Sequence, residues 1–175
     1  MSSARSRSTH PDAVDVIIDQ WKRELPELAS ENMALIGRLR RCSILLAPRL
    51  DEVFAAHDLS NGAFDVLATL RRAGAPYILT PTELFASLMV TSGTMTTRLQ
   101  KVQKRGLIER ITNPDDARSM LVKLTGAGRE LVEKVVFEHV ENERRILEKL
   151  PAETRRQLDA GLAELMRVLE DAKKD

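Results

Sequence analysis

A polar helical face that begins with small residues and ends with lysines is the clearest chemical signal in the sequence. Residues 92–105 read SGTMTTRLQKVQKR, and Met95, Leu99 and Val102 recur there at helical spacing as an inward face. Small residues allow a close approach to base edges, the backbone N–H groups at a helix start favour phosphate, and terminal lysines can reach flanking phosphates. The alternative is a solvated helix face with ordinary capping. The outward residues of this candidate DNA-binding helix are Ser92, Gly93, Thr94, Thr97, Gln100, Lys101 and Lys104.

Positive charge is concentrated around this helix. The chain of 175 residues is almost neutral, with a formal charge of +1. Residues 91–123 carry seven basic and three acidic residues, a net charge of +4, whereas residues 126–175 carry ten basic and twelve acidic residues, a net charge of −2. A local basic region in a neutral chain favours a contact with nucleic acid at that region.

Composition excludes several other classes of protein. Apolar residues make up 43% of the chain, enough for a sizeable core, and the single Cys42 excludes an internal disulfide. The three histidines are scattered and suggest no metal site, and no phosphate-binding glycine loop or nucleophile motif predicts an enzyme or a cofactor. No stretch approaches the ~20 apolar residues of a membrane span. We therefore expect a soluble cytoplasmic protein that is not an enzyme.

The elements before the polar helix are predicted to be helical. Residues 1–11 are expected to form a disordered tail, and residues 12–25 a helix capped by Asp12. A longer helix is predicted over residues 30–57, with Pro48 kinking or splitting it. A short helix then starts at Asn61, after Ser60.

The elements around and after the polar helix complete a recognisable order. An extended piece at 77–79 precedes a short helix opened by Thr80 and Pro81, and Thr91 can cap the helix at 92–105. Two β-prone runs, 107–112 and 119–124, flank a polar turn and predict a hairpin, called the wing below. Thr125 can then cap a helix over 126–149, and a last helix over 152–172 follows the helix breaker Pro151.

This order predicts a mainly α fold with a small β-hairpin, namely a winged helix–turn–helix with a helical dimerisation region. The expected domains are N-terminal helices at 12–58, a DNA-binding domain at 59–125 and C-terminal dimerisation helices at 126–175. The terminal helices carry more apolar surface than one small lobe can cover, which predicts a homodimer.

Three segments resemble the MarR family of bacterial transcriptional regulators: LTPTEL at 79–84, residues 91–110 and residues 113–128. The strongest element is D-x-R-x-x-x-V-x-L-T, in which Asp116 and Arg118 can pair across the wing turn and present Arg118 to the minor groove. Ala117 departs from the family, which often has a second arginine there. The resemblance implies a homodimer that binds a palindromic operator in double-stranded DNA and represses transcription.

Four further residues resemble the urate-responsive branch of that family, which has an extra N-terminal helix: Trp21, Asp65, Arg98 and Arg110. The resemblance implies a pocket for a small anionic aromatic effector, in which the indole stacks on a flat ring and the arginines bind an anionic oxygen. Each residue also has a structural alternative: a packing anchor for Trp21, an ion pair between Asp65 and Arg98, and a phosphate contact for Arg110.

Two other functions stay open at this point. Cys42 could sense peroxide, as in some MarR proteins, although a small buried core residue is the simpler interpretation. The chain could also be a helical protein-interaction module that does not bind DNA. Salt distinguishes that module from a DNA-binding protein, because binding through several phosphates weakens steeply as the salt concentration rises.

Overall fold

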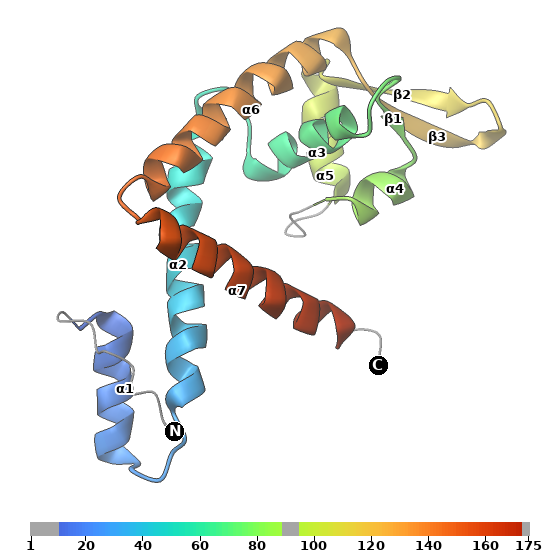
Figure 1. Ribbon diagram of the computed structural model, residues 1–175. Coiled ribbons are helices and arrows are strands. Elements are labelled where there is room, and N and C mark those ends of the chain that lie inside the picture. Colours follow the sequence, from blue (N-terminus) through green and yellow to red (C-terminus); the bar gives the residue numbers. More distant parts are fainter. Residues whose placement is uncertain (1–10, 89–94, 173–175) are drawn as a thin grey trace. The chain divides into compact units, whose positions relative to one another are not determined.

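The computed structural model describes residues 11–88 and 95–172, which are mostly helical with one small antiparallel sheet (Figure 1). The mainly α winged helix–turn–helix class expected from the sequence is thereby confirmed. Of the expected tail, residues 1–10 lie outside the described residues. The elements are α1 (Ala13–Glu24), α2 (Glu31–Ala55), α3 (Asn61–Arg72), β1 (Ile78–Leu79), α4 (Pro81–Ala86), α5 (Met95–Lys104), β2 (Ile108–Asn113), β3 (Asp116–Leu124), α6 (Gly126–Leu147) and α7 (Ala152–Asp171).

The chain forms two compact units, of which the first ends at Arg49 and the second begins at Leu50. The second unit is built around α3, whose residues from Gly62 to Leu70 are all buried. This helix contacts α4, α5, α6 and β3. Burial on every side removes apolar area from water, the main favourable term in folding, so α3 is the centre of the core.

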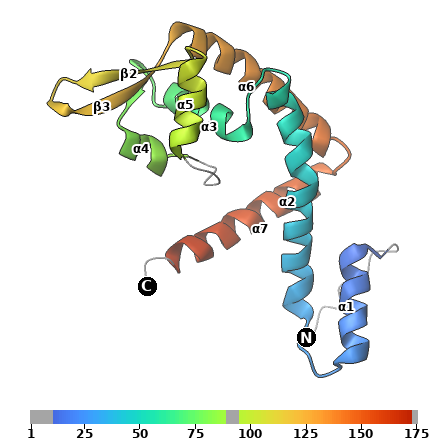
Figure 2. The ribbon, with the colours of Figure 1, turned by 180° about the vertical axis from the view of Figure 1, so that it is seen from behind.

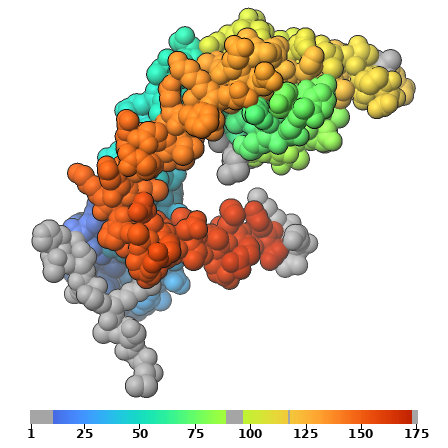
Figure 3. Space-filling view, turned by 45° about the horizontal axis from the view of Figure 1, so that its top comes forward, coloured from blue at the N-terminus to red at the C-terminus, as the bar shows by residue number. Residues whose placement is uncertain are grey.

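The sheet has the strand order β1-β3-β2, and both pairings are antiparallel. The expected hairpin is confirmed, but β3 also pairs with β1, so that Leu79 lies opposite Val122. The sequence indicated only an extended piece here, because a strand of two residues is too short to show alternation. Figure 3 shows the wing, in yellow, projecting beyond the helices of its own unit.

The long helix α2 runs without a break through Pro48, so of the two expected effects, a kink or a split, the split is wrong. A proline removes one N–H donor, and that loss can be tolerated when the flanking turns are held by packing. Leu50, Val53 and Phe54 pack into the core of the second unit and hold the last turns of α2 in place.

The predicted helix caps at Asp12, Thr80 and Thr125 are confirmed. Each side chain accepts a hydrogen bond from a backbone N–H of the first helical turn. At α4, Glu83 completes a capping box with Thr80, and the backbone and side-chain hydrogen bonds from Thr80 lower the pKa of the Glu83 carboxyl.

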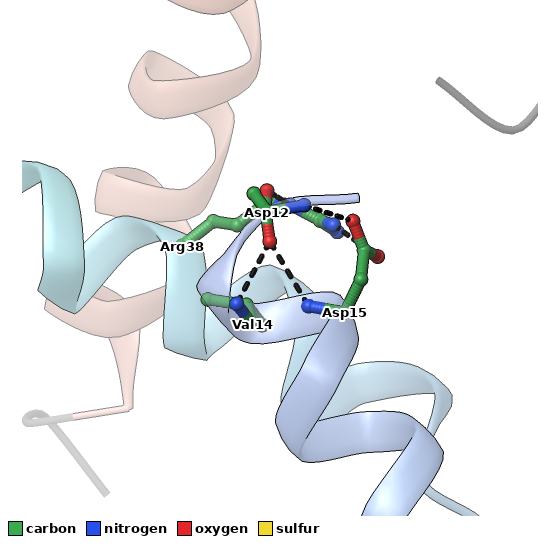
Figure 4. A network of polar contacts seen from close by, with 4 residues as sticks. All are labelled: Asp12, Val14, Asp15 and Arg38. Atoms are coloured by element: carbon green, nitrogen blue, oxygen red, sulfur yellow. Dashed lines mark hydrogen bonds and ion pairs between the residues drawn. The ribbon is translucent and has the colours of Figure 1, made fainter. Parts of the chain in front are cut away.

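A polar network joins the start of α1 to α2 in the first unit (Figure 4). Asp12 Oδ1 accepts from the backbone nitrogens of Val14 at 2.8 Å and Asp15 at 2.9 Å. Arg38 of α2 donates Nε to Asp12 at 2.8 Å and Nη2 to Asp15. The Arg38 guanidinium and these N–H donors lower the pKa of Asp12 to about 2, whereas Arg38 and the backbone N–H of Asp12 lower the pKa of Asp15. The network therefore holds α1 on α2 as long as the two carboxyl groups are ionised.

We expect Arg38→Gln to make the attachment of α1 more sensitive to acid. A depressed carboxyl pKa contributes stability above the ordinary value near 3.8 and loses it as the pH falls through about 2. Without Arg38, the carboxyl pKa values return toward 3.8 and this stabilisation is already missing at neutral pH, so acid should release α1 at a higher pH. Trp21 of α1 is the only tryptophan, so acid titration of its fluorescence reports this directly. Arg40→Gln, also on α2, is the control, and equal acid midpoints for the two variants would contradict the expectation.

Candidate nucleic-acid interface

Helix α5 presents one buried and one exposed face. Leu99 and Val102 are buried in the core, and Figure 2 shows α5 in front of α3. The predicted outward residues of the described part, Thr97, Gln100, Lys101 and Lys104, are all exposed. Ser92, Gly93 and Thr94, together with the expected cap Thr91, lie outside the described residues, as do the side chains of Met95 and Ala117.

The C-terminal end of α5 is fixed by backbone hydrogen bonds. Gly106 has a φ of 68°, a left-handed conformation that glycine adopts at little cost. Its N–H donates to Gln103 at 2.9 Å, and the N–H of Leu107 donates to Val102 at 3.0 Å. This pair of bonds is a Schellman motif, which ends the helix and directs the chain into β2.

The wing turn holds its own arginine, as predicted. Asp116 Oδ1 accepts the backbone N–H of Arg118 at 3.0 Å and contacts its Nε at 3.5 Å. Asn113 supports the turn by donating to Ser119 Oγ at 2.9 Å and accepting from the N–H of Asp115. The side chain of Arg118 is nevertheless 95% exposed. Asp116 therefore orients the turn while leaving the guanidinium available to an external anion.

Other cations of this region are engaged within the protein. Lys123 Nζ lies 2.9 Å from Glu109, its cross-strand neighbour, and Arg105 binds backbone carbonyls. Within the described ranges, Lys101 and Lys104 form no ion pair. The positive charge directed to solvent thus comes chiefly from these two lysines, Arg118 of the wing turn and Arg110, which is exposed on β2.

Of the four predicted effector residues, two lie on contacting helices. Asp65 of α3 is buried, at 5% exposure, and lines a hollow of about 770 Å³ together with Phe64 and His139. Arg98 of α5 lies against Gly62 of α3, since a Cβ on Gly62 would fall 2.6 Å from Arg98 Nε. Gly62 precedes Asp65 by one turn, so the Arg98 guanidinium lies over the first turn of α3.

The other two predicted effector residues belong to other elements. Arg110 is exposed on β2, opposite Val122 of β3. Trp21 belongs to α1 in the first unit and is 39% exposed. The effector role of all four residues stays a prediction.

Cys42 is exposed on α2, so the expectation of a small buried core residue is wrong. The reason is that the buried apolar residues of the first unit, Val14 and Ile18, lie on α1, and the core there is too small to enclose the whole surface of α2. Among the described residues, no group of three or more potential ligands could hold a metal ion, and no helix is long and apolar enough to cross a membrane.

His57, in the turn after α2, makes a structural contact with α6. Its Nε2 lies 2.7 Å from Glu138 Oε2 of α6, and this contact lowers the pKa of the Glu138 carboxyl. His139, also on α6, packs against the rings of Phe54 and Phe64.

Sequence reasoning missed three positions that shape this region: Gly62, Arg105 and Gly128. A Cβ on Gly128 would overlap the carbonyl oxygen of Leu107. The same carbonyl accepts the N–H of Thr125 at 3.1 Å, and Thr125 Oγ1 donates to Gly106 at 2.7 Å. The start of α6 therefore locks onto the loop between α5 and β2. Of these three positions, only Gly128 had a signal in the sequence, because the segment KLTGAG places two glycines directly after the predicted cap Thr125.

A comparison with known proteins agrees with this geometry. A model of the MarR family matches residues 57–119. The chain is 43% identical over 149 residues to the HTH-type transcriptional regulator PecS of Dickeya dadantii, covering 85% of this chain and 90% of PecS. It is 36% identical over 85 residues to the multiple antibiotic resistance protein MarR of Escherichia coli, covering 49% of this chain and 57% of that protein.

Solved structures show the same fold. A MarR-like transcription regulator from Bacillus cereus superposes with a TM-score of 0.72 at 25% identity, covering 81% of this chain and 99% of the other. A MarR variant from E. coli, complexed with operator DNA, gives a TM-score of 0.63 at 27% identity and covers 79% of this chain and 99% of its own.

The fold and these relatives define a winged helix–turn–helix transcriptional regulator, and the relatives named are regulators rather than enzymes. The chain belongs to the MarR family.

We expect Gly128→Ala to destabilise the protein by more than about 2 kcal/mol, because the new methyl group would displace backbone rather than a flexible side chain. Urea denaturation measures the loss. Gly126→Ala is the matched control, since a Cβ at that position meets nothing within 4 Å. Equal stability of the two variants would show that the junction can open to admit a side chain.

Proposed function

We propose that this protein is a homodimeric transcriptional regulator of the cytoplasm that represses genes by binding a palindromic operator and is released by a small anionic aromatic effector. The observation that carries the DNA-binding part is the exposed polar face of α5 beside the exposed Arg118. A MarR variant of similar fold was solved in complex with operator DNA. The wing and α5 belong to the proposed DNA-binding domain at 59–125.

The proposed contact has two parts. Thr97 and Gln100, with Ser92, Gly93 and Thr94, would face base edges in the major groove, where small and hydrogen-bonding side chains can approach closely. Lys101 and Lys104 would neutralise phosphates beside that groove, and Arg118 would enter the neighbouring minor groove. Asp116 has the supporting role of orienting the wing turn.

Uncovered apolar surface supports a homodimer formed by segments 12–58 and 126–175. On α6, Phe137 is 78% exposed, and α7 has no buried residue. Figure 3 shows the orange α6 open along one face of its unit. A second copy would cover such surface, and a two-fold dimer would place half-sites about one helical turn of DNA apart. Large exposed apolar residues of these helices include Ile17, Leu35, Ile44, Leu45, Val140, Leu158, Leu162, Met166 and Leu169.

We expect the protein to bind the DNA upstream of its own gene with an affinity that falls steeply as salt rises. Lys101→Gln should reduce the slope of log affinity against log salt by about 0.9, because it removes one phosphate contact, whereas Arg118→Gln should lower the affinity by removing the minor-groove contact. Fluorescence anisotropy of a labelled duplex measures both quantities. Lys149→Gln, an exposed lysine near the end of α6, should change neither. A flat salt dependence, or no binding, would favour the protein-interaction module.

The effector proposal rests on the position of Arg98. This residue is on the helix proposed to contact DNA, yet its guanidinium lies against Gly62 near the buried Asp65. An anion that competes for Arg98 would therefore shift α5 relative to α3. A coupling of about 1–3 kcal/mol is enough to change DNA affinity several-fold to a hundredfold. Trp21 and Arg110 are the other residues that the resemblance to the urate-responsive branch implies for an effector role.

We expect urate or xanthine to weaken DNA binding by the wild type but not by Arg98→Ala. Gly62→Ala should also lose the response, because its methyl group would displace the Arg98 guanidinium. Operator affinity with and without each purine measures the effect. Arg129→Ala, an exposed arginine of α6, should respond like the wild type. The purine proposal fails if neither compound changes wild-type binding.

The exposure of Cys42 favours a second candidate, a peroxide-responsive regulator of the same family. Insensitivity of DNA binding to peroxide would exclude it.

A further inference from the structure

The end of α5 is attached to the turn that follows α2 through one arginine. Arg105 Nη1 donates to the carbonyl oxygen of Asp58 at 2.6 Å, and Nη2 donates to that of His57 at 3.1 Å. All three residues belong to the second compact unit. The two bonds use the planar fork of the guanidinium, which fixes both distance and orientation.

The carbonyls that Arg105 binds are available because of how α2 ends. Asp58 has a left-handed φ of 54°, its N–H donates to Ala55 at 3.0 Å, and the N–H of Leu59 donates to Phe54 at 2.9 Å. The last carbonyls of a helix have no partner within it and carry its negative dipole end. A guanidinium placed there donates hydrogen bonds to the carbonyls and its positive charge offsets the negative end of the helix dipole.

The turn that receives Arg105 is itself held firmly. The His57 side chain contacts Glu138 of α6 at 2.7 Å, and Phe54 is buried with its ring 4.5 Å from that of Phe64. Arg105 therefore connects the C-terminal end of α5 to a turn that is itself held by contacts with α3 and α6. Two directed hydrogen bonds to neighbouring carbonyl oxygens indicate that Arg105 has a positional role and does not only add positive charge to the surface.

We propose that Arg105 is a positioning residue that fixes the C-terminal end of α5 for DNA binding and is not itself a phosphate contact. This inference rests on the proposed function. A small tilt of that end would misalign the exposed Thr97 and Gln100 with base edges, whereas the long, flexible side chains of Lys101 and Lys104, in the last turn of α5, would still reach their phosphates. The number of phosphates available to the protein would stay the same.

The test compares Arg105→Gln with its neighbour Lys104→Gln in the full-length protein, on the duplex upstream of its own gene. For Arg105→Gln we expect a loss of affinity of roughly tenfold with the wild-type salt slope, as for a lost charge-assisted hydrogen bond. For Lys104→Gln the slope should fall by about 0.9. Arg105→Lys keeps the charge but lacks the fork, and it should not restore affinity.

Hydrogen exchange of the free protein supplies a readout that does not depend on DNA. Amides at the end of α5 and at Leu107 should exchange at least about tenfold faster in Arg105→Gln, whereas those of α3 should not change. A reduced salt slope restored by Arg105→Lys, or exchange rates equal to the wild type, would overturn the inference. If the wild type binds no DNA, the proposed function fails, and the exchange rates alone then decide whether Arg105 holds α5.

Discussion

The burial of α3 is the constraint on which the second compact unit depends. Val66, Leu67 and Leu70 are completely enclosed, and each such side chain contributes about 1.5–3 kcal/mol on burial. Because α4, α5, α6 and β3 all contact this one helix, their relative positions are set by a single shared core. The faces of α5 that do not touch α3 are then free to carry polar and cationic residues without cost to the core.

The cations proposed to meet DNA and most of the exposed apolar side chains lie on different elements. The former are on α5 and the wing, whereas most of the large exposed apolar side chains are on α1, α2, α6 and α7. Within the cationic region, several charges serve the protein itself: Lys123 pairs with Glu109, and Arg105 binds the end of α2. A count of basic residues therefore overstates the charge that a partner would meet, and geometry is needed to identify the residues that reach outward.

Local features were predictable from the sequence because their causes are local. The apolar spacing of Leu99 and Val102 identified the buried face of α5, and the caps at Asp12, Thr80 and Thr125 act within one helical turn. The positions that escaped prediction depend on contacts between distant segments. Gly62 makes room for Arg98, and β1 becomes a strand only because β3 lies beside it. Cys42 was misjudged because a helix stripe does not tell which parts of it a small unit can enclose.

The junction at Gly128 has a mechanical consequence. The backbone of α6 touches the Leu107 carbonyl with no room for a side chain, while Thr125 ties the same loop by two hydrogen bonds. Because α6 and the loop are packed this closely, a displacement of one must displace the other. A rotation of α6 about its own axis must therefore move the loop at Gly106 and Leu107, and with it the start of β2. Movement of the long helix is thus coupled directly to movement of the wing.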